Sequence, residues 1–188
     1  MKPSVLLSLL LPAAAHAHPS GNWELTLESG YLRNIGDNTA IDYEIIPTQL
    51  TLRSPAVWTP WENAAGAKFV VRHRVSALFE SIVAGPEDRY IGLAAAPSLE
   101  YWFPSETTSL FFSIGGGLGL TNSAGGADGL GHDLTLNWFA HLGLRRTLRY
   151  GLSLLGGVYF LHHSNGGRTD PNPGIDALGA TIGLGWSF

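Results

Sequence analysis

The sequence predicts an all-β fold, an eight-stranded antiparallel transmembrane β-barrel of the bacterial outer membrane. Three observations predict it. The chain starts with a stretch typical of exported proteins, charged residues make up only 14% of a composition that includes 24 Gly and six Trp, and apolar and polar residues alternate along segment after segment. No later segment has the apolar run of about 20 residues that a membrane helix needs. An exported protein of this composition can still span a membrane if its strands close into a β-barrel.

The first residues have the pattern of a secretory signal peptide. Lys2 gives a positive start, Val5 to Leu11 is apolar, and Ala15-His16-Ala17 is a small-x-small cleavage pattern. We therefore expect residues 1–17 to be removed and residues 18–188 to form one barrel domain. The apolar run is too short to span a bilayer as a helix. A buried N-terminal helix is the alternative interpretation.

Composition also excludes some classes of function. The chain has no cysteine, so neither disulfides nor thiol chemistry is available. Its formal net charge is -4 and it has no long basic run, which argues against nucleic acid as a partner.

Eight segments alternate as barrel strands must, since one side faces lipid and the other the lumen. In chain order they cover about 23–31, 46–53, 69–83, 91–103, 110–120, 134–145, 150–164 and 174–188. Their apolar faces carry, in turn, Trp23, Leu25 and Leu27; Ile46, Leu50 and Leu52; Phe69, Val71 and Val75; Ile91, Leu93 and Leu99; Leu110, Phe112 and Leu118; Leu136, Trp138 and Leu142; Leu152, Leu154 and Val158; and Ile182, Leu184 and Trp186. An even number is the rule for bacterial single-chain barrels. The terminal Phe188 resembles the assembly signal of outer-membrane proteins.

The other face of these strands carries the charges Glu24, Glu28, Arg72, Arg74, Glu80 and Glu100. Side chains fill the interior of an eight-stranded barrel, so these charges can pair there. A soluble β-sandwich or lipocalin alternates too, with the apolar set inside. Alternation alone does not separate the two. Low charge, the signal peptide and Phe188 favour the membrane barrel.

The links between strands predict which end faces the cell surface. Links 104–106 and 147–149 are short, whereas 122–131 and 165–173 are longer and Gly-rich or polar. Short turns lie on the periplasmic side, so the seventh strand runs outward and ends at the cell surface. Link 54–66 is an exception: it is long but falls on the periplasmic side, which requires a turn excursion or extended strands.

A candidate catalytic site falls at this outer end. His162 and Ser164 continue the apolar, lipid-facing side of the seventh strand, and counting back by twos from Ile182 puts Asp176 on the same side of the eighth. The two strands pair, so these residues are neighbours. Polar groups facing lipid are costly unless they serve a purpose. A Ser activated by a His that a carboxylate orients is the arrangement for nucleophilic ester cleavage.

The sequence leaves the oxyanion donors open between Asn165, Asn172 and the N–H groups of the Gly166–Gly167 turn. The same stretch has other interpretations. A polar run at a strand end is often only the start of a loop, and Asp170 is a rival acid. His162 and His163 make a poor metal-binding pair, because consecutive strand residues face opposite sides.

The stretch closely resembles the active-site hairpin of the PagL-type lipid A 3-O-deacylases, His-x-Ser-Asn-x-Gly followed by Pro-Asn-x-Gly-Ile-Glu. Here the residues are His162-His163-Ser164-Asn165-Gly166-Gly167 and then Pro171-Asn172-Pro173-Gly174-Ile175-Asp176. The departure is Asp176, which keeps the charge of Glu and shortens its reach by one methylene. The resemblance implies an eight-stranded outer-membrane barrel that hydrolyses the ester at the 3-position of lipid A. It implies no cofactor and no metal, and a membrane-embedded enzyme whose partner is outer-leaflet lipopolysaccharide.

Two alternatives remain at this point. An outer-membrane phospholipase A shares a similar His-x-Ser-Asn-Gly run, but on twelve strands with calcium and an amide as third member. Twelve strands of about 10 residues each, plus turns, fit residues 18–188 only tightly. The second is a non-catalytic structural or adhesive barrel. The sequence does not fix the oligomeric state, and a homodimer is left open.

Overall fold

The structure, a computed structural model, describes residues 19–37, 41–123, 129–170 and 172–188. The expected signal peptide, residues 1–17, lies outside this part. After a 3-10 turn η1 (Pro19–Gly21), the strands are β1 (Glu24–Asn34), β2 (Glu44–Arg53), β3 (Trp58–Glu62), β4 (Lys68–Ala84), β5 (Arg89–Trp102), β6 (Thr108–Thr121), β7 (Leu134–Thr147), β8 (Leu152–Ser164) and β9 (Ile175–Ser187). No helix in the described part is long and apolar enough to cross a membrane.

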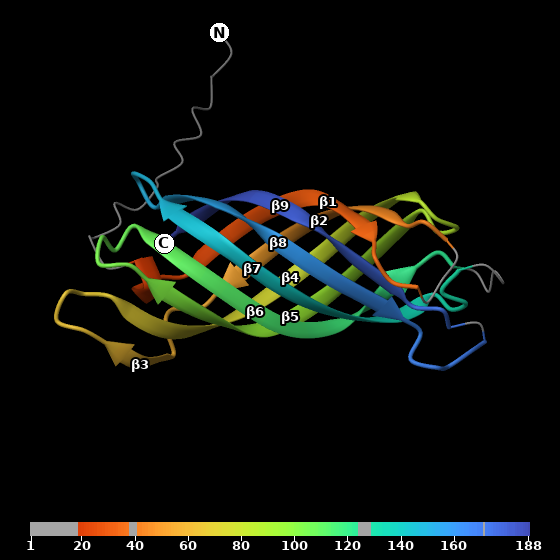
Figure 1. The fold of residues 1–188 in the computed structure, drawn as a ribbon, viewed down its shortest axis with the longest axis horizontal. Helices are drawn as coiled ribbons and strands as arrows, with labels where there is room; N and C mark the ends of the chain where they lie inside the picture. Colours follow the sequence, from red (N-terminus) through yellow and green to blue (C-terminus); the bar gives the residue numbers. More distant parts are fainter. Residues whose placement is uncertain (1–18, 38–40, 124–128, 171) are drawn as a thin grey trace, which may run out of the picture.

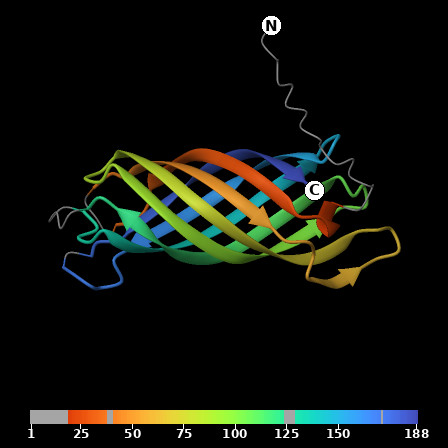
Figure 2. The same ribbon diagram turned by 180° about the vertical axis from the view of Figure 1, so that it is seen from behind.

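Eight of these strands close into a barrel. The sheet order is β2-β1-β9-β8-β7-β6-β5-β4-β3, and a further pairing of β2 with β4 joins its ends. All pairs are antiparallel. The strands wind around the barrel at a marked tilt (Figures 1 and 2), as closure of a sheet requires. The predicted eight-stranded antiparallel barrel is confirmed.

The ninth strand, β3, accounts for the long link 54–66. It lies outside the closed barrel and pairs only with the first residues of β4, with Glu62 opposite Lys68 and Trp58 opposite Val71. All five residues of β3 are exposed. Figure 1 shows it at the same end of the barrel as the C-terminus. The link is a strand excursion, and its one-sided pairing is why local alternation did not predict a separate strand.

The apolar residues face outward and the charged residues face the lumen. Leu27, Leu93 and Ile182 have exposed fractions of 56%, 61% and 64%. In contrast, Glu28, Arg74 and Glu100 are at most 1% exposed. A soluble barrel would bury the first set and expose the second, because apolar burial drives its folding. This inversion is the arrangement of a barrel in lipid.

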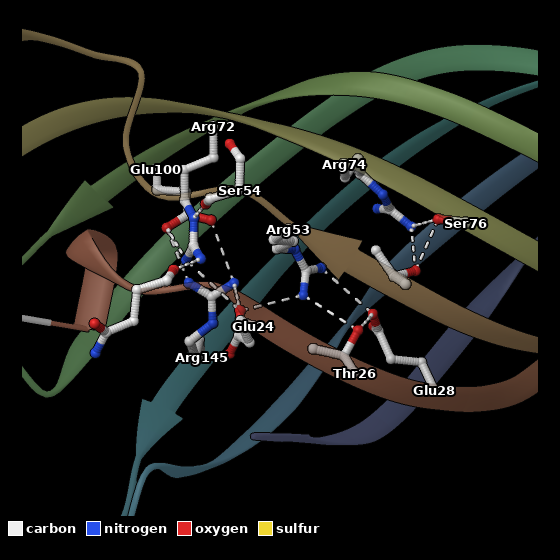
Figure 3. Close-up of polar contacts among 12 residues, drawn as sticks. Glu24, Thr26, Glu28, Arg53, Ser54, Arg72, Arg74, Ser76, Glu100 and Arg145 are labelled. Atoms are coloured by element: carbon white, nitrogen blue, oxygen red, sulfur yellow. Dashed lines mark hydrogen bonds and ion pairs between the residues drawn. The ribbon is translucent and has the colours of Figure 1, made fainter. Parts of the chain in front are cut away.

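The lumen near the termini holds a network of ion pairs (Figure 3). Arg145 binds Glu100 through two bonds of 2.9 and 3.2 Å and approaches Glu24 at 3.0 Å. Arg72 lies 3.6 Å from both carboxylates, and Arg53 lies 3.6 Å from Glu24. Strands β1, β2, β4, β5 and β7 thus share charges across the lumen. Buried charges require such pairing, because desolvation of an isolated ion is very costly.

The other half of the lumen, toward the end of β8, is filled mainly by apolar and aromatic side chains. Members of this buried cluster include Leu32, Ile45, Leu78, Tyr90, Phe139, Tyr159, Leu161 and Ile175. The outer end of β8 therefore rests on a packed core. The candidate site lies on the outside of this half, at the end of the barrel opposite the C-terminus (Figure 1).

We expect Arg145→Met to destabilise the barrel, because it removes the cation that makes the shortest contacts with buried Glu100 and Glu24 and leaves them only the longer contacts with Arg72 and Arg53. Breaking a buried pair in this way costs about 3–5 kcal/mol. The free energy of unfolding of the refolded barrel in detergent, followed by tryptophan fluorescence in urea, measures the loss. Arg146→Met is the matched control, since Arg146 is exposed and its guanidinium donates to the exposed side of the sheet at Thr108. Equal urea midpoints for the two variants would contradict the expectation.

Candidate active site

Strands β8 and β9 bring the predicted site residues together. Along β8, Leu154 and Val158 face outward and are exposed, His162 and Ser164 follow on the same face half-buried, and His163 between them is fully buried. The alternation of a strand thus continues unbroken to its last residue. On β9, Asp176 is the direct cross-strand partner of His162. The sequence prediction that both lie on the outer wall is confirmed by the register and burial.

A short hydrogen bond joins the imidazole to the carboxylate. His162 Nδ1 lies 2.7 Å from Asp176 Oδ1, and the side chains are 24% and 21% exposed. A carboxylate at Nδ1 favours the tautomer with its proton on that nitrogen, which leaves the lone pair of Nε2 as the base. Of the two acids considered from the sequence, Asp176 is the one bonded to His162.

Residues from a neighbouring strand and from two loop segments lie close to the pair. The ring of Trp138, the partner of His162 on β7, lies 6.0 Å from the imidazole between centroids. Gly174 is so close that a Cβ there would lie 3.3 Å from His162 Cε1. Gly36, which follows β1, lies against Asp176 in the same way: a Cβ there would be 2.9 Å from Asp176 Cβ and 3.0 Å from Oδ2. Sequence reasoning missed Gly36 and Trp138, because no local pattern links them to the hairpin.

Ser164 ends β8 opposite Leu136 of β7. No hydrogen bond joins its hydroxyl to His162 within the part of the chain that the structure describes. Residues two apart on a strand are separated by about 6.5 Å along it, which accounts for the gap between the two side chains. Among the described residues, the structure thus shows the bond between His162 and Asp176 but no bond between Ser164 and His162.

The two asparagines named as oxyanion candidates hold the loop after β8. The side chain of Asn165 is buried and donates to the carbonyl oxygens of Leu130 and Thr169 at 2.9 and 3.0 Å. Its backbone N–H donates to Asn172 Oδ1 at 2.9 Å. Both amides therefore have structural bonds in this loop.

Gly166 and Gly167 turn the chain immediately after Asn165. Their φ values are +68° and +72°, in the left-handed region that glycine adopts without strain. Among the described residues, the N–H of neither glycine has a hydrogen-bond partner. These two N–H groups are therefore available donors two and three residues after Ser164.

A family model described as lipid A 3-O-deacylase (PagL) matches residues 37–185. The chain belongs to the lipid A 3-O-deacylase (PagL) family. This match includes β8, all but the last two residues of β9, and most of the barrel. The predicted family, its lipid A substrate and its outer-membrane location are confirmed.

One solved structure supports the fold, and a second is a weaker match. The crystal structure of the outer membrane enzyme PagL is similar, with 20% identity and a TM-score of 0.52 over 85% of this chain and 97% of that one. The outer membrane protein Ail of Yersinia pestis, in a phospholipid bilayer nanodisc, matches with 18% identity and a TM-score of 0.35 over 88% of this chain and 99% of that one. No curated protein sequence matches the chain. The eight-stranded closure also differs from the twelve strands expected of the phospholipase alternative.

We expect Gly36→Ala to lower the deacylase kcat about 10-fold, because its methyl group displaces the Asp176 carboxylate and misaligned catalytic groups lose rate steeply. Initial rates of fatty acid release from lipopolysaccharide in detergent measure the effect. Gly21→Ala is the control, since a Cβ at Gly21 would meet nothing within 4 Å. Wild-type kcat in Gly36→Ala would show that this contact does not orient the carboxylate.

Proposed function

We propose that this PagL-family protein hydrolyses the ester at the 3-position of lipid A with Ser164 as nucleophile, His162 as general base and Asp176 as orienting acid. The observation that carries the proposal is the 2.7 Å bond between His162 and Asp176 on the outer wall. A hydrogen-bonded imidazole and carboxylate beside a serine are costly on a lipid-facing surface unless they serve a purpose. They supply what serine ester hydrolysis needs.

The reaction proceeds in two halves. Ser164 Oγ attacks the ester carbonyl while His162 Nε2 accepts its proton, and Asp176 stabilises the imidazolium that forms. Collapse of the tetrahedral intermediate breaks the bond to the sugar oxygen, which takes the proton from His162. Water, deprotonated in turn by His162, then attacks the acyl-serine. Collapse of this second intermediate breaks the bond to Ser164 Oγ, which takes the proton back from His162, and the 3-hydroxy fatty acid is released.

Charge that develops on the carbonyl oxygen requires donors near Ser164. We assign this role to the N–H groups of Gly166 and Gly167, which have no other partner among the described residues. Asn172 is a second donor candidate, because its side chain lies at the same turn and is bonded through its oxygen, leaving its NH₂ group to face substrate. The role of Asn165 is to hold the loop.

The position of the site supports lateral access of substrate. The apolar residues Val158 and Leu178 lie below it on the same outward face, with exposed fractions of 52% and 39%. Acyl chains can lie along this wall while the polar head of lipid A meets the triad at the barrel end. We propose that this end faces the cell surface and that residues 1–17 are removed on export.

Ser164→Ala should lower the rate of lipid A deacylation at least about 1,000-fold, because no other group in the site replaces the nucleophile. The refolded protein is incubated with lipopolysaccharide, and mass spectrometry of the lipid A detects loss of one 3-hydroxyacyl chain. Deacylation by the variant at the wild-type rate would refute the triad. Cleavage of added phospholipid instead of lipid A would reassign the substrate.

Asp176→Asn should lower kcat by about 10³- to 10⁴-fold, since the amide cannot stabilise the imidazolium and favours the wrong tautomer. The same assay, with kcat and KM measured separately, is used. Asp170→Asn serves as the matched control, because Asp170 is an exposed acid in the same loop and we expect its variant to keep wild-type kcat. A larger loss for Asp170→Asn than for Asp176→Asn would exchange the roles of the two acids.

A further inference from the structure

A buried histidine lies between the proposed base and the proposed nucleophile. His163 projects into the lumen and is 0% exposed. Its Nε2 lies 2.7 Å from Oε2 of Glu80, a β4 residue that is 3% exposed. The reaction proposed above uses neither residue. The pair nevertheless holds the backbone at the point where His162 and Ser164 turn outward.

The His163–Glu80 contact spans the barrel. From β8 to β4 there are four steps around the closed sheet in either direction, through β7, β6 and β5 or through β9, β1 and β2. The two strands are therefore on opposite walls. A bond between them ties the outer end of the active-site strand to the far side of the barrel, which neighbouring-strand hydrogen bonds cannot do.

Packing around His163 limits the motion of its ring. The ring of Tyr90 lies 4.2 Å away between centroids. Asn137, the partner of His163 on β7, donates to the Tyr90 hydroxyl at 2.6 Å. Ile175, its partner on β9, is fully buried. The imidazole is thus held by the Tyr90 ring and by Glu80, and its cross-strand partners on both neighbouring strands are buried.

We propose that His163 and Glu80 are positioning residues, which fix the end of β8 so that His162 and Ser164 have the geometry for reaction. This inference rests on the proposed triad. Side chains of consecutive strand residues project from one backbone, so a twist at residue 163 turns both outward neighbours. Ser164 is the last residue of β8, where a strand frays most easily. An inward bond one residue earlier opposes that fraying.

The surroundings argue that the pair serves more than stability. Its half of the lumen is otherwise mainly an apolar and aromatic cluster. Buried polar pairs of this kind can often be replaced by well-packed apolar residues at no loss of stability. A directional bond, in contrast, specifies one backbone position, which a catalytic strand needs and a purely structural one does not.

The test compares kcat and KM of His163→Leu and Glu80→Leu with those of the wild type, per molecule of folded barrel. Folded protein is counted from its heat-modifiable electrophoretic mobility. We expect kcat to fall about 10- to 100-fold, as for catalytic groups misplaced by about 1 Å, with KM little changed. His163→Gln, whose amide can still donate to Glu80, should recover most of the loss.

His141→Leu is the matched control. His141 is also a fully buried lumen imidazole and is bonded to Thr181 at 3.1 Å, but it lies near the ion-pair network. We expect its variant to lose stability and keep wild-type kcat. Wild-type kcat in His163→Leu, or an equal loss of kcat in His141→Leu, would overturn the proposal. If His163→Leu does not fold, Glu80→Gln, which keeps the side-chain volume, is judged by the same criteria.

Ser164→Ala in the same series separates this proposal from the triad. An active Ser164→Ala protein would refute the triad, on which the positioning role rests. An inactive Ser164→Ala protein together with a fully active His163→Leu protein would refute the positioning role alone. The rate at which a fluorophosphonate labels the serine gives an independent readout, and we expect it to fall in His163→Leu and not in His141→Leu.

Discussion

The alternation of side chains along a strand governs this molecule at every level. In a closed barrel the backbone bonds are all satisfied between strands, so each side chain must face either lipid or lumen. Charged residues such as Arg145 and Glu100 pair inside, and leucines such as Leu93 face out. The same alternation turns His162 and Ser164 outward and His163, the residue between them, inward. A lipid-facing site and its buried support thus come from one strand.

The two halves of the lumen stabilise the barrel in different ways. Near the termini, arginines and glutamates from five strands neutralise one another. These ion pairs fix the strands relative to each other and restrict their motion. Beneath the site, the packed cluster around Tyr159 and Phe139 supports the outer ends of β7, β8 and β9. A rigid wall of this kind suits the proposed reactive groups, which lie on the exterior surface of the barrel.

Much of the fold and the hairpin could be predicted from the sequence, because strand alternation is a local property. It gave all eight barrel strands and placed Asp176 on the face of His162. Contacts between distant strands could not be predicted in this way. Pairing of β3 with β4, the approach of Gly36 to Asp176 and the bond from His163 to Glu80 depend on the register and curvature of the closed sheet. No spacing in the sequence encodes them, and the roles of Asn165 and Asn172 in the loop were equally hidden.

The one departure from the family motif has a physical explanation in this register. Asp176 stands where the PagL-type pattern has Glu, and a shorter acid should reach less far. Here His162 and Asp176 are direct cross-strand partners, and in such pairs the Cβ atoms lie only about 4.5–5.5 Å apart. The aspartate therefore reaches Nδ1 at 2.7 Å without an extra methylene. Gly36 lies close against the carboxylate and leaves little room for a longer side chain at position 176. The short side chain of Asp176 and the missing side chain of Gly36 are therefore complementary.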